Sequence, residues 1–290
     1  MKISNITVST ALNYAEKILQ ETSIANYELD AKILLSHILN LTNSENLILK
    51  LNEKISLEDY LKYIHLIERR LKFEPIAYII GSKNFWKQEY IVDKNVLIPR
   101  PETELIIELL LKKLKGKINN ELHILDLGTG SGCIILSLLS ELKFSTGIGI
   151  DISEKALNIA KLNAKKFDLI TRVNFKISNW FNNLENTDKF DVIISNPPYI
   201  AINEWKNLDP NVLNFEPKKA LTDNYDGLEN YRIIANNAKK FLKKDGLIVL
   251  EMGFNQSKEI KGMFCAKRCE IEIFKDLQSI DRIVIIKDNL

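Results

Sequence analysis

In the later two thirds of the chain, short apolar runs alternate with helical stretches. Runs at residues 122–127, 146–151 and 190–195 are short and end in turn-forming residues, so we predict that they are buried strands. Strands that alternate with helices pair in parallel, because each helix returns the chain to the same edge of the sheet. Residues 270–274 and 282–287 are joined by a link too short for a crossover and must pair as a hairpin. The pattern predicts an α/β domain with a mostly parallel sheet and an antiparallel C-terminal edge.

The first of these strands runs directly into a glycine-rich turn. Gly128, Gly130 and Gly132 precede an apolar helical stretch at residues 133–142. Glycine permits positive φ and lets a ligand approach the backbone, and the next helix offers free N–H groups. Asp151 ends the following strand about twenty residues later, where an acid accepts hydrogen bonds from the ribose hydroxyls of a nucleoside. Turn and acid together predict a Rossmann-like site for a nucleoside-containing cofactor.

Two details of this turn disfavour a dinucleotide. The third glycine of a dinucleotide fingerprint would fall at position 133, which is Cys133. Asp126 stands just before the turn, where its carboxylate would repel a pyrophosphate. The same carboxylate would tolerate or favour the positively charged aminoacyl end of S-adenosylmethionine. The residues therefore favour a methyl donor.

A second motif, Asn196-Pro197-Pro198-Tyr199, follows the strand at 190–195. Proline cannot donate to a strand ladder, and the residue before it is held extended, so Asn196 is displayed at the C-terminal edge of the sheet. The Asn196 amide oxygen and a proline carbonyl can each accept one hydrogen of a planar NH2 group, and the Tyr199 ring can pack on its flat face. We interpret the motif as a grip for a nitrogen acceptor; a tight turn after a strand is the simpler alternative.

Together with Asp151, the two motifs resemble class I S-adenosylmethionine-dependent amino-methyltransferases. Further stretches narrow the resemblance. They are Glu74-Pro75-Ile76-Ala77-Tyr78-Ile79-Ile80-Gly81, Asn84-Phe85-Trp86, Leu97-Ile98-Pro99-Arg100-Pro101-Glu102-Thr103-Glu104, Phe215-Glu216-Pro217, Ala220-Leu221 and Asp226-Gly227-Leu228. The series is similar to the release-factor glutamine methyltransferases, the HemK/PrmC family. The resemblance covers residues 28–286, with its specific motifs between Glu74 and Gly253.

This resemblance implies a fold and a reaction. The fold is that of a class I S-adenosylmethionine-dependent methyltransferase: Rossmann-like, with a mostly parallel sheet, an antiparallel C-terminal hairpin and a small N-terminal helical bundle. The reaction is transfer of a methyl group from S-adenosylmethionine to the side-chain amide nitrogen, N5, of a glutamine. In the family that glutamine lies in the Gly-Gly-Gln motif of class I peptide-chain release factors, which are the implied protein partners.

The resemblance also implies which residues hold the donor. They are Gly128, Thr129, Gly130, Ser131, Gly132, Asp151, Trp180 and Asn196. The five residues of the turn would line the methionine part, Asp151 the ribose and Trp180 the adenine. One position departs from the family pattern: the residue before the tryptophan is often an aspartate that faces the adenine amino group, and here it is Asn179. An amide oxygen can still accept that hydrogen bond.

By the same resemblance, the tetrapeptide from Asn196 to Tyr199 binds the target glutamine. Asn196, Pro197 and Tyr199 are then the catalytic residues, and Pro198 completes the substrate-binding set. An amide nitrogen is a poor nucleophile because its lone pair is delocalised into the carbonyl. We therefore expect Asn196 to position the amide and stabilise developing charge, and not to act as a general base.

Helical periodicity over residues 8–80 predicts a small bundle that precedes the α/β domain. Residues 85–98 alternate in the manner of strands and predict a hairpin. We expect a helical substrate-binding domain at residues 1–80, a linker hairpin at 81–101 and a catalytic S-adenosylmethionine-binding domain at 102–290. A bundle that only caps the catalytic domain is the other interpretation of the first part.

Composition excludes several classes of protein. A net charge of +2 gives no field that argues for nucleic-acid binding. No apolar run approaches the roughly 20 residues that span a bilayer, and residues 1–20 lack the apolar core of a signal peptide. Cys133, Cys265 and Cys269 form no C-x-x-C pair and favour free thiols and no metal site. We expect a cytoplasmic protein with no direct contact with nucleic acid or membrane.

Two alternatives stay open at this point. The same chemistry could act on a ribosomal-protein glutamine or on the amino group of a nucleic-acid base, because the tetrapeptide does not separate one NH2 group from another. The fold could also carry a non-catalytic nucleoside-binding scaffold.

Overall fold

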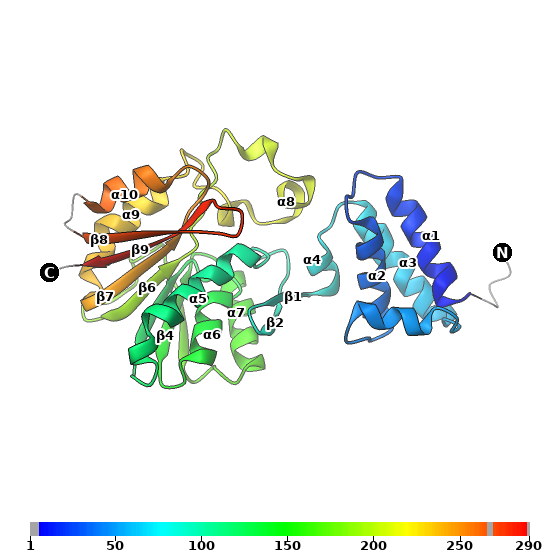
Figure 1. The fold of residues 1–290 in the computed structure, drawn as a ribbon, viewed down its shortest axis with the longest axis horizontal. Helices are drawn as coiled ribbons and strands as arrows, with labels where there is room; N and C mark the ends of the chain where they lie inside the picture. Colours follow the sequence, from blue (N-terminus) through cyan, green and yellow to red (C-terminus); the bar gives the residue numbers. More distant parts are fainter. Residues whose placement is uncertain (1–5, 266–268, 289–290) are drawn as a thin grey trace. The chain divides into compact units, whose positions relative to one another are not determined.

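The computed structural model describes residues 6–265 and 269–288, and the chain divides into two compact units (Figure 1). Unit 1 runs up to Gly81 and also takes in Asp209–Phe215, whereas unit 2 contains Ser82–Leu208 and the chain from Glu216 onward. The first five residues of the predicted bundle lie outside the described residues. None of the described helices is long and apolar enough to cross a membrane.

Unit 1 is the predicted helical bundle. Its helices are α1 (Val8–Gln20), α2 (Tyr27–Ile38), α3 (Leu57–Leu71), the short α4 (Ile76–Ile80) and α8 (Pro210–Phe215). Helix α1 begins where Thr7 and Thr10 exchange side-chain and backbone hydrogen bonds as a capping box. Ala11, Ala15 and Leu19 follow at helical spacing and are fully buried in the core of the unit. The hydrophobic period seen in the sequence therefore marks the packed face of the helix.

A buried guanidinium connects three helices of unit 1. Arg70, on α3, donates from Nε to Asp30 Oδ2 of α2 at 2.7 Å. Its Nη1 donates to Asn211 Oδ1 of α8 at 2.6 Å and to the Glu74 backbone carbonyl at 3.2 Å. The Arg70 and Asp30 side chains are only 8% and 11% exposed. A buried charge requires hydrogen-bonding partners, and Asn211 is one of them. Arg70 therefore fixes α8 to the other helices of unit 1, although α8 comes much later in the sequence.

Unit 2 contains a sheet with the strand order β5-β4-β3-β6-β7-β9-β8. The strands are β3 (His123–Leu127), β4 (Thr146–Asp151), β5 (Val173–Ile177), β6 (Phe190–Ser195), β7 (Leu242–Glu251), β8 (Cys269–Lys275) and β9 (Asp281–Asp288). Strands β3 to β7 pair in parallel, and β9 pairs antiparallel with both β7 and β8. The predicted parallel sheet and its antiparallel C-terminal edge are confirmed.

Helices cover both faces of this sheet (Figure 1). They are α5 (Glu104–Lys113), α6 (Cys133–Glu141), α7 (Glu154–Lys166), α9 (Glu229–Asn237) and α10 (Ser257–Cys265). Alternate residues of β3 serve the two cores: Ile124 packs with the cluster of α5, α6 and α7, whereas Leu125 and Leu127 pack with that of α9 and α10. A strand buried on both faces is mostly apolar, which explains the nearly continuous hydrophobic runs.

The hairpin between the two predicted domains is formed by β1 (Ser82–Phe85) and β2 (Gln88–Ile91), which pair antiparallel within unit 2. Asn163 of α7 acts as a side-chain partner for the edge of β2: it accepts from the Ile91 N–H at 2.7 Å and donates to the Ile91 carbonyl at 3.0 Å. Trp86 Nε1 donates to Glu141 at the end of α6 at 2.7 Å. The hairpin is thus fixed to the helices on one face of the sheet.

Replacing Arg70 by methionine should destabilise unit 1 by about 3–5 kcal/mol, because Asp30 is left as a buried, unpaired charge. Hydrogen-exchange mass spectrometry of the full chain should show faster exchange in α2 and α3. Lys50→Met is the matched control, since it removes the exposed partner of Glu53 and should leave these rates unchanged. Equal protection of Arg70→Met and the unmodified protein would contradict the role given to the pair.

Candidate functional site

A cavity of about 460 Å³ lies at the edge of the sheet where the parallel strands end. The ends of three strands that are neighbours in the sheet contribute to it. Gly128 follows β3, Asp151 is the last residue of β4, and Asn196 follows β6. Ligand sites of open α/β sheets lie at this edge, because the loops that leave the strands are free of the sheet ladder there. The two motifs found in the sequence therefore meet in one cavity.

The glycine turn presents its backbone to this cavity. Gly128 and Gly130 have φ angles of 72° and 55°, which side-chain-bearing residues rarely adopt. A Cβ atom at either position would meet no other atom within 4 Å, so the space above both glycines is open to a ligand. Thr129 and Ser131 are buried and, like Gly132, do not line the cavity. Of the five turn residues predicted to hold the donor, only Gly128 and Gly130 line the cavity.

Asp151 is an acceptor fixed by backbone groups. Its Oδ2 accepts the Gly130 N–H at 2.9 Å, and its Oδ1 accepts the Ser153 N–H at 2.8 Å. Burial raises its pKa from the ordinary value. A carboxylate oxygen that receives one N–H retains a further lone pair, so both oxygens can still accept hydrogens from a ligand. Asp151 is placed and oriented to bind hydroxyl groups.

Asp126 lies behind the turn and is fully buried. Thr129 Oγ1 donates to its Oδ2 at 2.6 Å, and no group of the described residues bonds to its Oδ1. Burial outweighs the threonine hydrogen bond and raises the pKa of Asp126 to about 7. Asp126 does not line the cavity, and its contact with Thr129 supports the turn from behind.

The other end of the cavity is built from the turn after β5. Ser178, Asn179 and Trp180 all line it. The Ser178 hydroxyl donates to the Trp180 carbonyl at 2.6 Å and accepts the Asn183 N–H at 3.0 Å, which closes the turn. Trp180 has a φ of 52°, a backbone conformation that such contacts must enforce. An indole and an amide at one end of the cavity are suited to a flat heteroaromatic ring that carries an amino group.

The tetrapeptide is held by hydrogen bonds from several segments. Asn196 Nδ2 donates to Thr103 Oγ1 at 3.1 Å, and Asn230 Nδ2 donates to the Pro198 carbonyl at 2.7 Å. Asn196 and Pro198 line the cavity, whereas Pro197 does not. Within residues 6–265 and 269–288, no group donates to the Pro197 carbonyl. Asn196 Oδ1 also has no donor among these residues, and of the two oxygens only that of Asn196 belongs to a residue that lines the cavity.

Tyr199, the last residue of the tetrapeptide, is held by the end of β7. It does not line the cavity, and its hydroxyl donates to Glu251 Oε1 at 3.4 Å. Its backbone carbonyl accepts from Gln256 Nε2 at 2.9 Å. Glu251 is buried at the end of β7, and burial raises its pKa to about 7. In this structure Tyr199 anchors the tetrapeptide to the sheet, and burial keeps its phenol neutral by raising its pKa.

Several residues that line the cavity lie outside the glycine turn and the tetrapeptide. They are residues 95–97, 217–220 and 222–224 together with Asn230. Part of this wall is fixed by Glu216, whose Oε2 accepts the Ile98 N–H at 3.1 Å and whose Oε1 accepts from Arg100 Nη2 at 2.6 Å. These contacts join two of the stretches that carried the family resemblance. The sequence pointed to this wall only through the family resemblance, because the spacing of its residues predicts no site.

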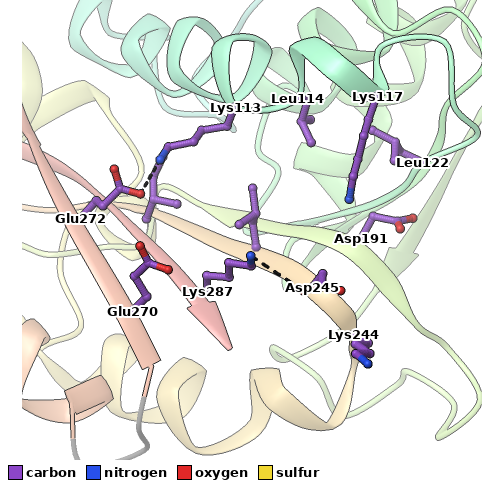
Figure 2. A pocket seen from close by; sticks show the side chains of 12 residues that line it. Lys113, Leu114, Lys117, Leu122, Asp191, Lys244, Asp245, Glu270, Glu272 and Lys287 are labelled. Atoms are coloured by element: carbon purple, nitrogen blue, oxygen red, sulfur yellow. Dashed lines mark hydrogen bonds and ion pairs between the residues drawn. The ribbon is translucent and has the colours of Figure 1, made fainter. Parts of the chain in front are cut away.

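A second hollow, of about 420 Å³, lies at the opposite edge of the sheet, where β6 and β7 begin (Figure 2). Lysines and acids alternate around it. Lys113 pairs with Glu272, and Lys287 lies 3.8 Å from Asp245. Charges of both signs neutralise one another here, and no residue of either motif is present. The chemistry expected from the motifs belongs to the first cavity.

Comparison with known proteins identifies the class. Residues 118–280 match the family model described as a methyltransferase domain, and residues 10–81 match the PrmC N-terminal domain. A "Methyltransferase" structure from Pyrococcus furiosus has a TM-score of 0.51 and 18% identity, and covers 77% of this chain and 98% of that chain. At that identity the likeness shows the fold alone. The chain is a class I methyltransferase preceded by a PrmC N-terminal domain.

A relative that the chain covers almost completely identifies the family. A "Release factor glutamine methyltransferase" of Caulobacter vibrioides is 37% identical over 281 residues, which cover 97% of this chain and 96% of the relative. A "Bifunctional methyltransferase" of Rickettsia typhi is 43% identical over 297 residues, which cover 97% of this chain but only 57% of the relative. The chain thus spans little more than half the length of the second relative. It belongs to the family of the release factor glutamine methyltransferases.

Asp126 should make the stability of the protein depend on pH. The folded protein keeps the Asp126 proton up to about pH 7, whereas the unfolded chain loses it near the ordinary value of 3.8. The free energy of unfolding should therefore fall as pH rises between about pH 4 and pH 7 and then level off.

Urea unfolding at several pH values measures this slope. Asp126→Asn should make it shallower, because the amide cannot ionise but can still accept from Thr129, while Glu251 keeps its own contribution. Asp168→Asn, at an exposed position, is the control and should keep the slope of the unmodified protein. Parallel slopes for Asp126→Asn and the unmodified protein would assign the pH dependence to other groups.

Proposed function

We propose that this protein transfers a methyl group from S-adenosylmethionine to N5 of the glutamine in the Gly-Gly-Gln motif of class I peptide-chain release factors. One observation carries the proposal: the Asn196 amide turns its NH2 group to Thr103 and leaves its oxygen free, at the edge of the cavity that Gly128 and Asp151 line. The names of the Caulobacter vibrioides relative and of similar proteins support the choice of substrate.

The cavity suits this donor in each of its parts. The open space above Gly128 and Gly130 admits the methionine part. Asp151 offers acceptors to the ribose hydroxyls, and Trp180 offers a flat apolar surface to the adenine. When bound, S-adenosylmethionine supplies a methyl group on a positively charged sulfur.

The residues of the tetrapeptide act on the acceptor. Asn196 Oδ1 and the Pro197 carbonyl can each accept one hydrogen of the glutamine NH2 group, which turns the nitrogen lone pair toward the donor. Both oxygens also stabilise the positive charge that develops on that nitrogen. Asn196 is neutral and takes no proton. The nitrogen releases its proton after methyl transfer, when it has become much more acidic.

The PrmC N-terminal domain match suggests a role for unit 1. A glutamine on a protein loop presents few atoms, so the binding energy that orders it must come from contacts away from the reacting nitrogen. We propose that unit 1 provides such contacts as a substrate-binding domain. Release factors act on ribosomes, which places the proposed reaction in the cytoplasm.

Mass spectrometry tests the substrate directly. A purified release factor incubated with the protein and S-adenosylmethionine should gain one methyl group on the glutamine of its Gly-Gly-Gln motif. A release factor with that glutamine changed to alanine is the control and should gain none. Methylation of a ribosomal protein or of RNA in parallel reactions, with the release factor unmodified, would overturn the choice of substrate in favour of the same chemistry on another nitrogen.

Asp151→Ala should weaken donor binding, because a charged acceptor contributes about 1.5–3 kcal/mol to a hydrogen bond. The donor dissociation constant from isothermal titration should rise by roughly tenfold or more. Glu154→Ala, which removes an exposed acid three residues further on, is the matched control and should bind the donor normally. An unchanged affinity of Asp151→Ala would exclude the ribose contact.

Asn196→Ala should reduce kcat much more than it changes the donor dissociation constant, because the contact of Asn196 is with the acceptor in the transition state. Asn196→Asp should also be slow, since it adds a charge to a site suited to a neutral group. Asn182→Ala removes an exposed amide of the same size and should behave as the unmodified protein does. Near-normal turnover of Asn196→Ala in the mass-spectrometric assay would remove the residue from the mechanism.

A further inference from the structure

Three polar side chains from distant parts of unit 2 form a chain of hydrogen bonds behind the tetrapeptide. Glu251 ends β7, Thr103 ends the 3-10 turn Pro101–Thr103 before α5, and Asn196 follows β6. Thr103 Oγ1 lies 2.6 Å from Glu251 Oε2 and 3.1 Å from Asn196 Nδ2. Thr103 and Glu251 are 2% and 1% exposed, so water does not compete for these bonds.

The direction of these bonds follows from the count of hydrogens. A threonine hydroxyl has one hydrogen, and a carboxylate has none. When Glu251 is ionised, the Thr103 hydrogen must point to it. The Thr103 oxygen can then only accept, so it bonds to the NH2 end of Asn196 and would repel the carbonyl end. The Asn196 oxygen is left on the side of the amide that does not face Thr103.

We propose that Glu251 and Thr103 are positioning residues that fix the orientation of the Asn196 amide, so that its oxygen and not its NH2 group meets the acceptor nitrogen. The inference rests on the proposed function, because it takes an NH2 group as the acceptor. An Asn196 side chain turned the other way would face that NH2 group donor to donor. It would lose the hydrogen bond and repel the substrate.

Protonation of Glu251 would remove this control. A neutral Glu251 can donate to Thr103, and the Thr103 hydrogen is then free to bond to the Asn196 oxygen, which turns the amide around. Burial is the main cause that raises the pKa of Glu251 to about 7. Turnover at saturating donor should therefore rise with pH through an acid limb near this value.

Other groups around Glu251 adjust this titration. The Thr103 and Tyr199 hydroxyls and the positive charge of Arg282 on β9 favour the ionised form, whereas the charge of Glu102 disfavours it. Arg282 is shared with Asp276, whose Oδ2 lies 3.1 Å from its Nη2. On α9, the Tyr231 hydroxyl donates to the Glu251 backbone carbonyl at 2.8 Å. On α6, burial is the main cause that raises the pKa of the Cys133 thiol, and the negative charge of Glu251 raises it further. Among the residues that the structure describes, Arg282 is the one cation that acts on the Glu251 carboxylate, and Asp276 partly neutralises it.

Substitutions at Thr103 separate orientation from folding. Thr103→Val keeps the shape of the side chain and removes the hydroxyl, so kcat should fall by about tenfold or more, the equivalent of one oriented hydrogen bond. Thr103→Ser keeps the hydroxyl and should restore most of that loss. The donor dissociation constant should stay within about twofold in both variants, because neither Thr103 nor Glu251 lines the donor cavity. Thr146→Val, at an exposed position at the start of β4, is the matched control.

The pH profile gives a readout that a merely structural role would not produce. Glu251→Gln cannot ionise, so the acid limb of kcat should disappear between about pH 6 and pH 8. Normal kcat in Thr103→Val, or a full acid limb in Glu251→Gln, would overturn the inference. If Thr103→Val loses donor binding, the Glu251→Gln profile decides alone. Failure of the unmodified protein to methylate any release factor would refute the proposed function. If the unmodified protein methylates a release factor and Thr103→Val does so equally fast, only the positioning role is refuted.

Discussion

The site depends on the register with which β3 pairs with its two neighbours. Leu127 lies opposite Ile150 of β4 on one side and Ser195 of β6 on the other. The next residues of the three strands are Gly128, Asp151 and Asn196, so one register brings all three to the same edge. The Ser195 hydroxyl donates to the Leu127 carbonyl at 2.7 Å and adds a side-chain bond to the ladder. A slip of one residue would turn every side chain of a strand to the opposite face and separate the donor cavity from the tetrapeptide.

Buried carboxyls at this edge represent a balance between stability and activity. Asp126 and Glu251 are both buried, and burial raises the pKa of each to about 7. An apolar residue of similar size would stabilise the sheet better. Each acid instead serves a neighbour: Asp126 accepts from Thr129 in the glycine turn, and Glu251 accepts from Thr103, the partner of Asn196. Functional sites commonly keep such groups because their chemistry needs them.

The segment after the tetrapeptide has two roles that its sequence does not separate. Its residues Asp209–Phe215 belong to unit 1, where Asn211 accepts a hydrogen bond from Arg70. Directly afterwards, Glu216 accepts from Ile98 and Arg100 of unit 2, and Pro217 lines the cavity. The seven residues Asp209–Phe215 therefore belong to unit 1, and the residues that follow them directly form part of the cavity wall in unit 2.

The sequence by itself determined the class of fold and most of the chemistry. Local patterns were sufficient: strand runs alternating with helices predict the parallel sheet, and helical periodicity predicts the bundle. Gly128, Gly130, Asp151 and Asn196 were also found from the sequence, because a motif at a strand end must lie at the edge of the sheet. These features depend on residues that are close together in the chain or on strand ends whose placement the topology dictates.

Only the tertiary structure decided which side chains face the cavity and which support it. It joined the Tyr199 hydroxyl to Glu251, and it placed Thr103 between Glu251 and Asn196. It also carried Asn211 to the buried Arg70. Such contacts join residues separated by 52 to 148 positions, and no periodicity or spacing encodes them, since a hydroxyl or a carboxylate in the sequence carries no sign of its partner. They are fixed by packing, because a buried polar group must find a partner wherever the completed fold provides one.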